Sequence, residues 1–303
     1  MSARARIAAA MLMSATGLIA AGCGGESSAA RHAPTIHVVT GLFPLAQAIE
    51  QIGQDKVTVT DVVPAGDDPT TYRLTAVQVA QVQDAPVVVD VGGGFQPSLE
   101  AAAAGRSEVA GPSGAQVDVN LQTELRVRDP YVWLDPKVMG QAVNLIAAAL
   151  ERANPAAAPV YRDGARAFGE EVLSTGIDYS DTLLTCTRRM IVTPDGAFAA
   201  VASEYGLTDE IVGTASNPSA VALTAAANRL EPDLTTLFAE PFADDGTITA
   251  LAGARGLKDR VLDPLTGPPP GGWVGRTDYL SLMEKNLATL YNALGCPNAD
   301  TGQ

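Results

Sequence analysis

The chain has 303 residues, of which 47% are hydrophobic and 18% charged, a composition typical of a folded protein of one or two domains rather than a disordered one. Its 34 acidic residues outnumber its 20 basic ones, so the formal charge is −14, and the absence of a basic run excludes a nucleic-acid-binding footprint. Only two histidines occur, His32 and His37, which excludes a site built from three imidazoles.

Residues 1–22 have the features of a lipoprotein signal peptide. Two arginines precede an uncharged apolar stretch at 7–21, and small residues lead directly to Cys23. This ending resembles bacterial lipoprotein signals, and the resemblance implies cleavage before Cys23 and acylation of its thiol. A plain secreted protein with an incidental cysteine is the alternative. Residues 23–34 are expected to be a flexible tether, so that the folded part is extracytoplasmic and lipid-anchored to the cell membrane.

Two further cysteines remain once Cys23 is acylated. In an exported chain an even pair predicts a disulfide, here between Cys186 and Cys296. Two buried free thiols are the alternative. Metal binding by the pair is disfavoured because neither cysteine has companion ligands nearby.

Strand and helix patterns alternate along residues 35–152. The segment 87–91 is almost purely valine, which is typical of a parallel strand buried on both faces. Asp135 and Pro136 form an N-cap and first position of a helix, whereas the polar segment 105–118 is expected to be a loop. This order predicts an N-terminal α/β lobe with a parallel sheet. The predicted strands are 35–39, 57–63 and 87–91, and the predicted helices are 43–52, 75–83, 97–104 and 136–152.

The segment 153–185 predicts one long connecting helix in mid-chain. It is rich in Ala, Arg, Glu and Leu, although Gly164, Gly169 and Gly176 weaken it. The alternation then restarts and predicts a C-terminal α/β lobe at 186–303. Two lobes with a helical connector predict a clamp that closes on a ligand. The predicted strands are 190–193, 210–212, 236–239 and 260–262, and the predicted helices are 196–205, 219–230, 245–254 and 277–294.

Acidic residues follow several of these strands. Asp67 and Asp68 come after the second strand, and Asp195, Glu240 and Asp263 come after three strands of the second lobe. Ligands of open parallel sheets bind beyond the carboxyl ends of the strands, so acidic groups at three such ends predict a cation site. The alternative is that those followed by proline are turn and cap residues.

Motifs of the common enzyme classes do not occur in the sequence. There is no nucleophile elbow and no P-loop, and the triglycine at 92–94 does not continue into a dinucleotide-binding fingerprint. Because both histidines lie near the N-terminus, a Ser-His-Asp triad is hard to build. The sequence therefore predicts a protein that is not an enzyme.

Five motifs occur in a characteristic order. They are Gly-Asp-Asp-Pro-Thr-Thr-Tyr at 66–72, Asp-Pro-Tyr-Val-Trp-Leu-Asp-Pro at 129–136, Val-Thr-Pro-Asp-Gly-Ala-Phe at 192–198, Val-Leu-Asp-Pro-Leu at 261–265 and the closing helix at 279–287. This series resembles the zinc- and manganese-binding solute receptors of ABC importers, the TroA-like or ZnuA-like class. The resemblance implies two α/β lobes, each with a parallel sheet flanked by helices, joined by one long helix and holding a metal ion between them.

The resemblance places the four metal ligands at Thr70, Tyr131, Asp195 and Asp263. The class usually has histidine at the first two positions, so that only the two carboxylates of the second lobe survive here. A neutral hydroxyl and a phenol are poor substitutes for imidazole. The sequence therefore predicts weak binding of a hard divalent cation by two carboxylates and water, with Asp67 or Asp68 as an additional carboxylate ligand. His37 is interpreted as a sheet residue rather than a relocated ligand.

These observations predict an extracytoplasmic solute-binding protein of a metal-type ABC importer. It would act as a monomer, and its partner would be an ABC permease in the membrane. Zinc or manganese would be its transported ligand rather than a resident cofactor. The alternative is a non-transport accessory lipoprotein, an adhesin or partner-binding paralogue, that has lost metal binding.

Overall fold

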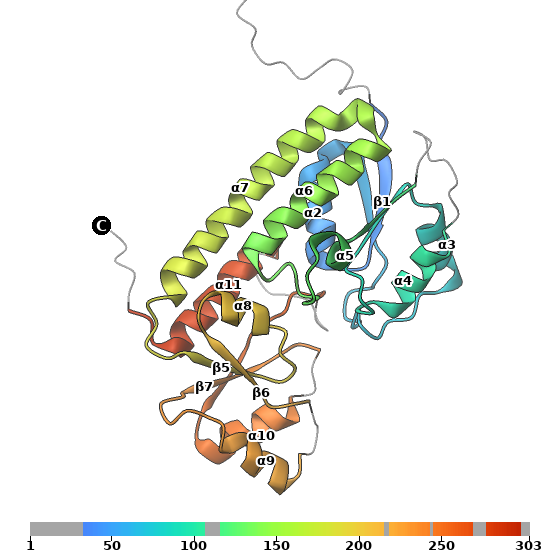
Figure 1. The fold of residues 1–303 in the computed structure, drawn as a ribbon. Helices are drawn as coiled ribbons and strands as arrows, with labels where there is room; N and C mark the ends of the chain where they lie inside the picture. The colour runs from blue at the N-terminus through green and yellow to red at the C-terminus, as the bar shows by residue number, and fades with distance from the viewer. Residues whose placement is uncertain (1–32, 107–115, 215–217, 243–244, 269–276, 298–303) are drawn as a thin grey trace, which may run out of the picture.

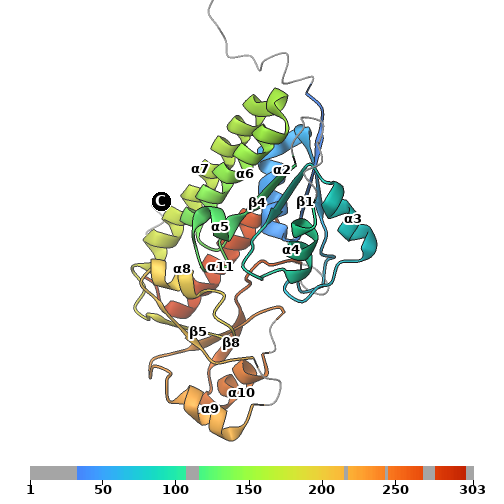
Figure 2. The ribbon, with the colours of Figure 1, turned by 45° about the vertical axis from the view of Figure 1, so that its right-hand side comes forward.

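The computed structural model describes residues 33–106, 116–214, 218–242, 245–268 and 277–297. They form two α/β lobes joined by one long helix, α7, which confirms the predicted fold class (Figures 1 and 2). The predicted signal peptide and residues 23–32 of the predicted tether, including Cys23, lie outside the described residues. The last two residues of that predicted tether belong to the fold instead, because Ala33 is buried in the core and the Pro34 carbonyl oxygen accepts the Asn154 amide.

The first lobe contains a four-stranded parallel sheet in the order β2-β1-β3-β4. β1 (Ile36–Thr40) pairs with β2 (Val57–Asp61) and β3 (Val87–Asp90), and β3 pairs with β4 (Val117–Asn120). β3 is buried along its whole length, as its valine run predicts. β4 corrects the expectation of a loop at 105–118. Because it is an edge strand, only its two valines are buried, and its alternate polar residues hide the strand pattern.

Helices cover both faces of this sheet. α2 (Phe43–Gly53) and α6 (Pro136–Ala153) pack with the β1 side chains that point to one face, whereas α3 (Ala76–Asp84) and α4 (Pro97–Ala104) pack on the other face. The short helix α5 (Leu121–Leu125) follows β4. Both faces are therefore shielded from solvent, as a parallel sheet requires.

The starts of two helices follow from their capping residues. The Thr75 hydroxyl accepts the Gln78 backbone N–H, and the Gln78 side chain accepts the Thr75 backbone N–H, which forms a capping box. The Asp135 carboxylate accepts the backbone N–H groups of Lys137 and Val138 at the start of α6. Both helix starts agree with the sequence pattern.

The long helix α7 (Ala158–Leu183) follows a short 3-10 turn at Pro155–Ala157. It packs lengthwise on α6 and α2 and also contacts α11. Gly164 permits this packing, because a Cβ there would lie only 2.3 Å from the carbonyl oxygen of Ile52. A glycine that weakens the helix in isolation thus allows two helices to approach closely.

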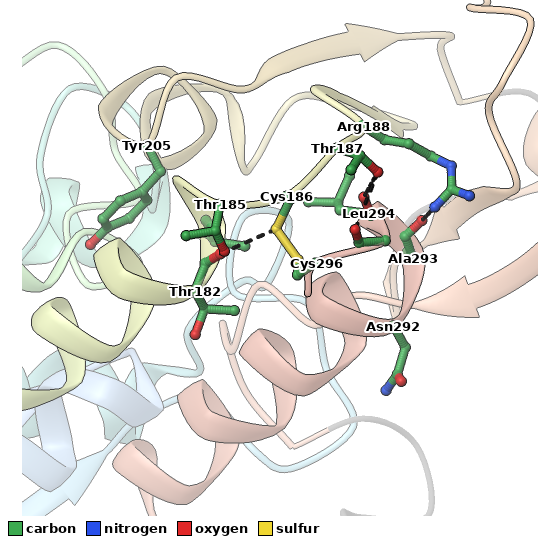
Figure 3. The surroundings of a disulfide bond; sticks show 12 residues. Thr182, Thr185, Cys186, Thr187, Arg188, Tyr205, Asn292, Ala293, Leu294 and Cys296 are labelled. Atoms are coloured by element: carbon green, nitrogen blue, oxygen red, sulfur yellow. Dashed lines mark hydrogen bonds between the residues drawn. A yellow bond between two sulfur atoms is a disulfide. The ribbon is translucent and has the colours of Figure 1, made fainter. Parts of the chain in front are cut away.

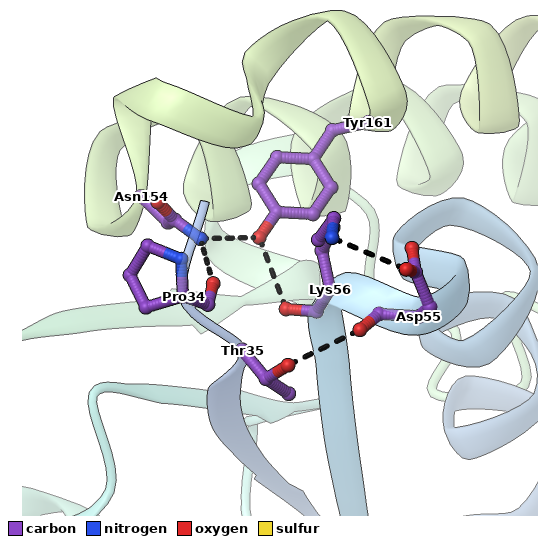
Figure 4. Close-up of polar contacts among 6 residues, drawn as sticks. All are labelled: Pro34, Thr35, Asp55, Lys56, Asn154 and Tyr161. Carbon is purple, nitrogen blue, oxygen red and sulfur yellow. Dashed lines mark hydrogen bonds and ion pairs between the residues drawn. The ribbon is translucent and has the colours of Figure 1, made fainter. Parts of the chain in front are cut away.

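A polar cluster joins the start of α7 to the beginning of the sheet (Figure 4). The Asn154 amide donates to the carbonyl oxygen of Pro34 over 2.7 Å and to the Tyr161 hydroxyl over 3.1 Å. The Tyr161 hydroxyl donates to the carbonyl oxygen of Lys56 over 3.3 Å. Burial raises the pKa of Tyr161 to about 12. This cluster holds Pro34, two residues before β1, against the start of α7.

The second lobe is built from two parallel strand pairs that lie side by side. β5 (Met190–Thr193) pairs with β6 (Thr208–Ile211), β7 (Thr236–Ala239) pairs with β8 (Lys258–Val261), and β5 contacts β7. β6 and β8 each begin two residues earlier than the sequence predicts. The first two positions of each strand carry polar or charged residues, which do not indicate a strand. The helices of this lobe are α8 (Ala199–Glu204), α9 (Ala220–Ala227), α10 (Gly246–Arg255) and α11 (Tyr279–Leu294).

The predicted disulfide between Cys186 and Cys296 is present in the structure (Figure 3). It joins the segment after α7 to the segment after α11. Next to it, the Arg188 guanidinium donates to the carbonyl oxygen of Ala293 over 3.1 Å, and the Arg188 backbone N–H donates to that of Leu294 over 3.0 Å. The end of α11 is therefore fastened to the start of the second lobe.

The largest hydrophobic core runs through both lobes. It contains the buried faces of α2, α6 and α7 together with second-lobe residues such as Phe198 and Leu262. Trp133 and Tyr179 are among the largest fully buried side chains in it. None of the helices in the described ranges is long and apolar enough to cross a membrane.

Candidate functional site

Three carboxylates of the second lobe lie just beyond its parallel strands. Asp195 follows β5, Glu240 directly follows β7 and Asp263 follows β8. Since β5 contacts β7 and β7 pairs with β8, the carboxyl ends of these strands meet at one edge of the lobe. Ligands of parallel sheets bind at this position.

Local hydrogen bonds orient the two predicted ligands of this lobe. Asp195 Oδ1 accepts the Ala197 N–H over 3.0 Å, and Asp263 Oδ1 accepts the Leu265 N–H over 2.8 Å. The buried Asn286 of α11 accepts the Asp263 N–H over 3.0 Å and donates to the Asp263 carbonyl oxygen over 2.6 Å. Both aspartates therefore have fixed orientations, as a ligand site requires.

Glu240 lies between these aspartates and is only 5% exposed. It forms a side-chain hydrogen bond with Asp195. Burial raises the pKa of Glu240 to about 9, and the negative charges of Asp195, Asp209 and Asp263 add to this effect. The Glu240 Oε1 atom has no hydrogen-bond partner within the described part of the chain.

Tyr131 faces these carboxylates from the first lobe. Its backbone N–H donates to Asp129 Oδ1 over 2.8 Å, which fixes the turn before α6. Its ring packs edge-on against Phe95 and Trp133, with centroid separations of 5.3 and 5.6 Å. The phenol is thus held by an aromatic cluster rather than by a flexible loop.

Acidic residues of both lobes act on the Tyr131 phenol. Burial and the negative charges of Asp195, Glu240, Asp129 and Asp68 raise the pKa of the phenol above its ordinary value. The phenol is therefore neutral at physiological pH. Acidic residues of both lobes therefore contribute to the electrostatic environment of this side chain.

Thr70 lies in the loop after β2. Its hydroxyl donates to Asp68 Oδ1 over 2.7 Å, and its backbone N–H donates to the same oxygen over 2.8 Å. Thr70 is therefore tied to Asp68, whose charge acts on Tyr131. The hydroxyl oxygen retains lone pairs with which it can accept a hydrogen bond or bind a cation.

Two hydrogen bonds fasten the lobes together beside the site. The indole N–H of Trp133, two residues after Tyr131, donates to the carbonyl oxygen of Pro264 over 2.7 Å. The Gly66 N–H donates to the carbonyl oxygen of Pro268 over 2.8 Å, so the loop that leads to Asp68 is also held. The segments that carry Tyr131 and Asp68 are therefore held against the second lobe.

The site is an oxygen site without imidazole. Among the described residues, no group of three or more His, Cys, Asp or Glu side chains is arranged to hold a metal ion. His37 lies in β1, and its Nε2 atom is 2.8 Å from the Thr60 hydroxyl of β2, in agreement with its interpretation as a sheet residue. Carboxylate, hydroxyl and phenol oxygens suit hard cations better than zinc.

Two acidic residues join the four predicted ligand positions at this site: Asp68, which the sequence offers as an additional carboxylate, and Glu240, which is missing from the predicted ligand set. Glu240 and Asp68 both couple electrostatically to Tyr131, and Glu240 contacts Asp195. In the sequence, both residues are indicated by their positions after predicted strands. The hydrogen bond between Glu240 and Asp195 joins two elements distant in sequence, so no local pattern indicates it.

Comparison with known proteins gives a family match. A model of the ZnuA family, described as zinc-uptake complex component A, periplasmic, matches residues 38–293. The high-affinity zinc uptake system protein ZnuA of Bacillus subtilis is 25% identical over 300 residues, covering 91% of this chain and 94% of that protein. The manganese-binding lipoprotein MntA of Halalkalibacterium halodurans is 26% identical over 289 residues, covering 91% and 95%. The chain spans about half, 55%, of the zinc-binding lipoprotein AdcA of Streptococcus pneumoniae.

Solved structures agree with this match at the level of the fold. The metal-dependent lipoprotein YcdH of Bacillus subtilis superposes with a TM-score of 0.76 at 24% identity, covering 86% of this chain and 100% of that one. The Zn(II)-bound ZnuA-like domain of Streptococcus pneumoniae AdcA gives a TM-score of 0.72 at 24% identity, covering 86% and 99%.

Proposed function

Because this chain belongs to the ZnuA family of periplasmic zinc-uptake components, we propose that it is the solute-binding protein of a metal-type ABC importer. It captures a divalent cation between its lobes outside the cytoplasm and delivers it to a membrane permease, with no covalent chemistry. The accessory-lipoprotein alternative is not favoured, because the relatives are named for zinc uptake and for binding zinc or manganese.

One observation carries this proposal for the chain itself. The indole N–H of Trp133, two residues after Tyr131, donates over 2.7 Å to the carbonyl oxygen of Pro264, which directly follows Asp263. This hydrogen bond holds the Tyr131 segment of the first lobe against the strand end that carries Asp263, and ligands of parallel sheets bind at such strand ends. Asp195 and Asp263 would supply the anionic oxygens, and Thr70 and Tyr131 would supply neutral ones.

The ligand chemistry favours manganese over zinc. Zinc sites in proteins draw on imidazole or thiolate ligands, and this site has neither. Manganese accepts carboxylate and hydroxyl oxygens. The site is therefore proposed to bind a hard divalent cation with modest affinity.

The membrane attachment is a further part of the proposal. Cys23 is the acylated residue, and the segment between it and Ala33, the first residue packed in the core, is the tether between the lipid and the fold. A monomer suffices, because all the candidate ligands belong to one chain.

Metal uptake in the native host tests this function. A strain lacking the gene is complemented with the wild type or with Asp195→Asn and Asp263→Asn combined, and accumulation of radioactive manganese and zinc is measured. The control carries Asp178→Asn and Asp181→Asn, which remove the same charge from exposed positions of α7. We expect uptake with the wild type and the control but not with the site variant. Equal uptake by all three would refute the proposal.

A further inference from the structure

A cavity lies at the opposite end of the second-lobe strands from the candidate cation site. It has a volume of about 460 Å³ and lies between β7, β8 and the C-terminal half of α11. Lys258 and Arg260, near the start of β8, and Lys285 on α11 contribute its charged side chains.

The geometry of the two walls directs these cations into one space. Lys258 and Arg260 are two residues apart in a strand, so their side chains leave the same face of β8. Lys285, Thr289 and Asn292 are spaced by four and three residues, so they share one face of α11. Two elements that are distant in sequence therefore present a common basic surface.

The three cations are not neutralised by neighbouring carboxylates. No acidic side chain lines the cavity. Within the described residues, no ion pair involves Lys258, Arg260 or Lys285. The one hydrogen bond of their side chains in the described part of the chain is from the Arg260 guanidinium to the carbonyl oxygen of Asp259. The chain carries a formal charge of −14, yet this cavity is lined by three cations and by no acidic side chain.

The walls of the cavity are fixed by the surrounding structure. The Cys186–Cys296 disulfide holds the end of α11. The Thr235 hydroxyl donates to the carbonyl oxygen of Ala293 over 3.2 Å, which joins α11 to the chain entering β7. β8 is held by its pairing with β7. The basic groups therefore converge on a preformed space, which lowers the entropic cost of binding.

We propose that this cavity binds a phosphoryl-bearing anion. A guanidinium and two ammonium groups supply charge-assisted donors from two sides, and Thr236, Thr289 and Asn292 add neutral polar groups. A tetrahedral phosphoryl group presents several acceptor oxygens and at least one full negative charge, which matches this set. The volume accommodates a small molecule rather than a single ion. The phosphoryl group belongs either to a soluble compound or to a lipid headgroup.

Calorimetric titration of the metal-free protein with inorganic pyrophosphate tests the assignment. The site variant combines Arg260→Gln with Lys285→Gln. The control combines Arg152→Gln with Arg166→Gln, which removes the same charge from exposed positions of α6 and α7. We expect saturable binding to the wild type and the control, and binding weaker by about tenfold or more in the site variant. A parallel arm measures sedimentation of the three proteins with phosphatidic acid vesicles and with phosphatidylcholine vesicles.

The two arms distinguish the sources of the anion. Binding of pyrophosphate alone supports a soluble ligand, and retention on phosphatidic acid vesicles that the site variant loses supports a lipid headgroup. Absence of binding in both arms overturns the proposal. Equal weakening in the site variant and the control also overturns it, because the effect would then reflect net charge. Binding of citrate in place of pyrophosphate would overturn the phosphoryl assignment.

Discussion

The indole N–H of Trp133 in the first lobe donates to the carbonyl oxygen of Pro264 in the second lobe over 2.7 Å. Trp133 is fully buried and lies two residues after Tyr131, and Pro264 directly follows Asp263. The Tyr279 hydroxyl donates to the carbonyl oxygen of Trp133, which adds a contact from α11. One buried side chain thus fixes the relative positions of two candidate ligand positions on different lobes.

Substitution of Trp133 tests this role. Trp133→Phe keeps an aromatic ring but removes the N–H, leaving the buried Pro264 carbonyl without its donor. We expect the free energy of unfolding to fall by about 1–3 kcal/mol and manganese affinity to fall as well, measured by urea denaturation and calorimetry. Tyr161→Phe removes a buried hydroxyl far from the site and should lower stability alone. An unchanged affinity in Trp133→Phe would contradict the positioning role.

The disulfide is expected to stabilise the fold. Cys186 and Cys296 are separated by 110 residues, and replacing both with alanine should lower the free energy of unfolding by up to about 4 kcal/mol through loop-closure entropy. Urea denaturation of the variant and the wild type measures the difference. Peptide mapping without reductant checks the bond itself, and two free thiols in the mature protein would disprove it.

Asp90 predicts a pH dependence of stability. Burial raises the pKa of Asp90 from 3.8 to about 7, and the charges of Glu100 and Asp118 contribute to this shift. Between pH 4 and pH 7 Asp90 loses its proton in the unfolded chain but keeps it in the folded chain. The folded state therefore becomes less stable relative to the unfolded state as the pH rises through this range. The loss is on the order of 4 kcal/mol at most.

Asp90→Asn should remove this component. The variant keeps an oxygen that can accept the Asn120 side-chain N–H, which donates to Asp90 Oδ1 over 3.0 Å. Its unfolding free energy should therefore decline less between pH 4 and 7 than that of the wild type, measured by urea denaturation at several pH values. Asp84→Asn, at the exposed end of α3, serves as the control. Parallel curves for Asp90→Asn and the wild type would contradict the assignment.

The cellular fraction in which the protein is found tests the proposed acylation of Cys23. Because acylation anchors the chain, Cys23→Ser should move the protein from the membrane fraction to the soluble exported fraction or leave it unprocessed. Immunoblots of the two fractions measure the change. Equal membrane retention of the wild type and the variant would exclude a lipid anchor at this residue.

The sequence predicts most elements of the fold because their signals are local. The valine run of β3 and the capping residues Thr75 and Asp135 act within a few positions of themselves. β4 escapes prediction because only its alternate residues are buried, which a short edge strand shares with many loops. The contact of Gly164 with Ile52 also escapes it, since helix propensity carries no information on close packing.

The candidate site is less predictable than the fold. Its four positions follow from the family resemblance, and strand ends indicate the acidic residues. The hydrogen bond between Glu240 and Asp195 and the effect of both on Tyr131 depend on how the two lobes meet. Such contacts join distant parts of the chain and leave no periodic pattern in the sequence.

Restoring the two missing imidazoles is expected to convert the site toward zinc. Thr70→His combined with Tyr131→His places two nitrogen ligands opposite Asp195 and Asp263. Zinc affinity should rise by roughly two orders of magnitude or more. Adding Asp195→Ala to this double variant should reverse much of the gain. No gain in the double variant would indicate that the space between the lobes suits a different ligand.

Calorimetric titration of the metal-free wild type with zinc and manganese tests the central claim most directly, with Asp195→Ala beside it. We predict weak binding, with manganese at least as well bound as zinc, and loss of both in Asp195→Ala. A nanomolar zinc affinity in the wild type, or binding that Asp195→Ala leaves unchanged, would contradict a cation site built on Asp195 and Asp263.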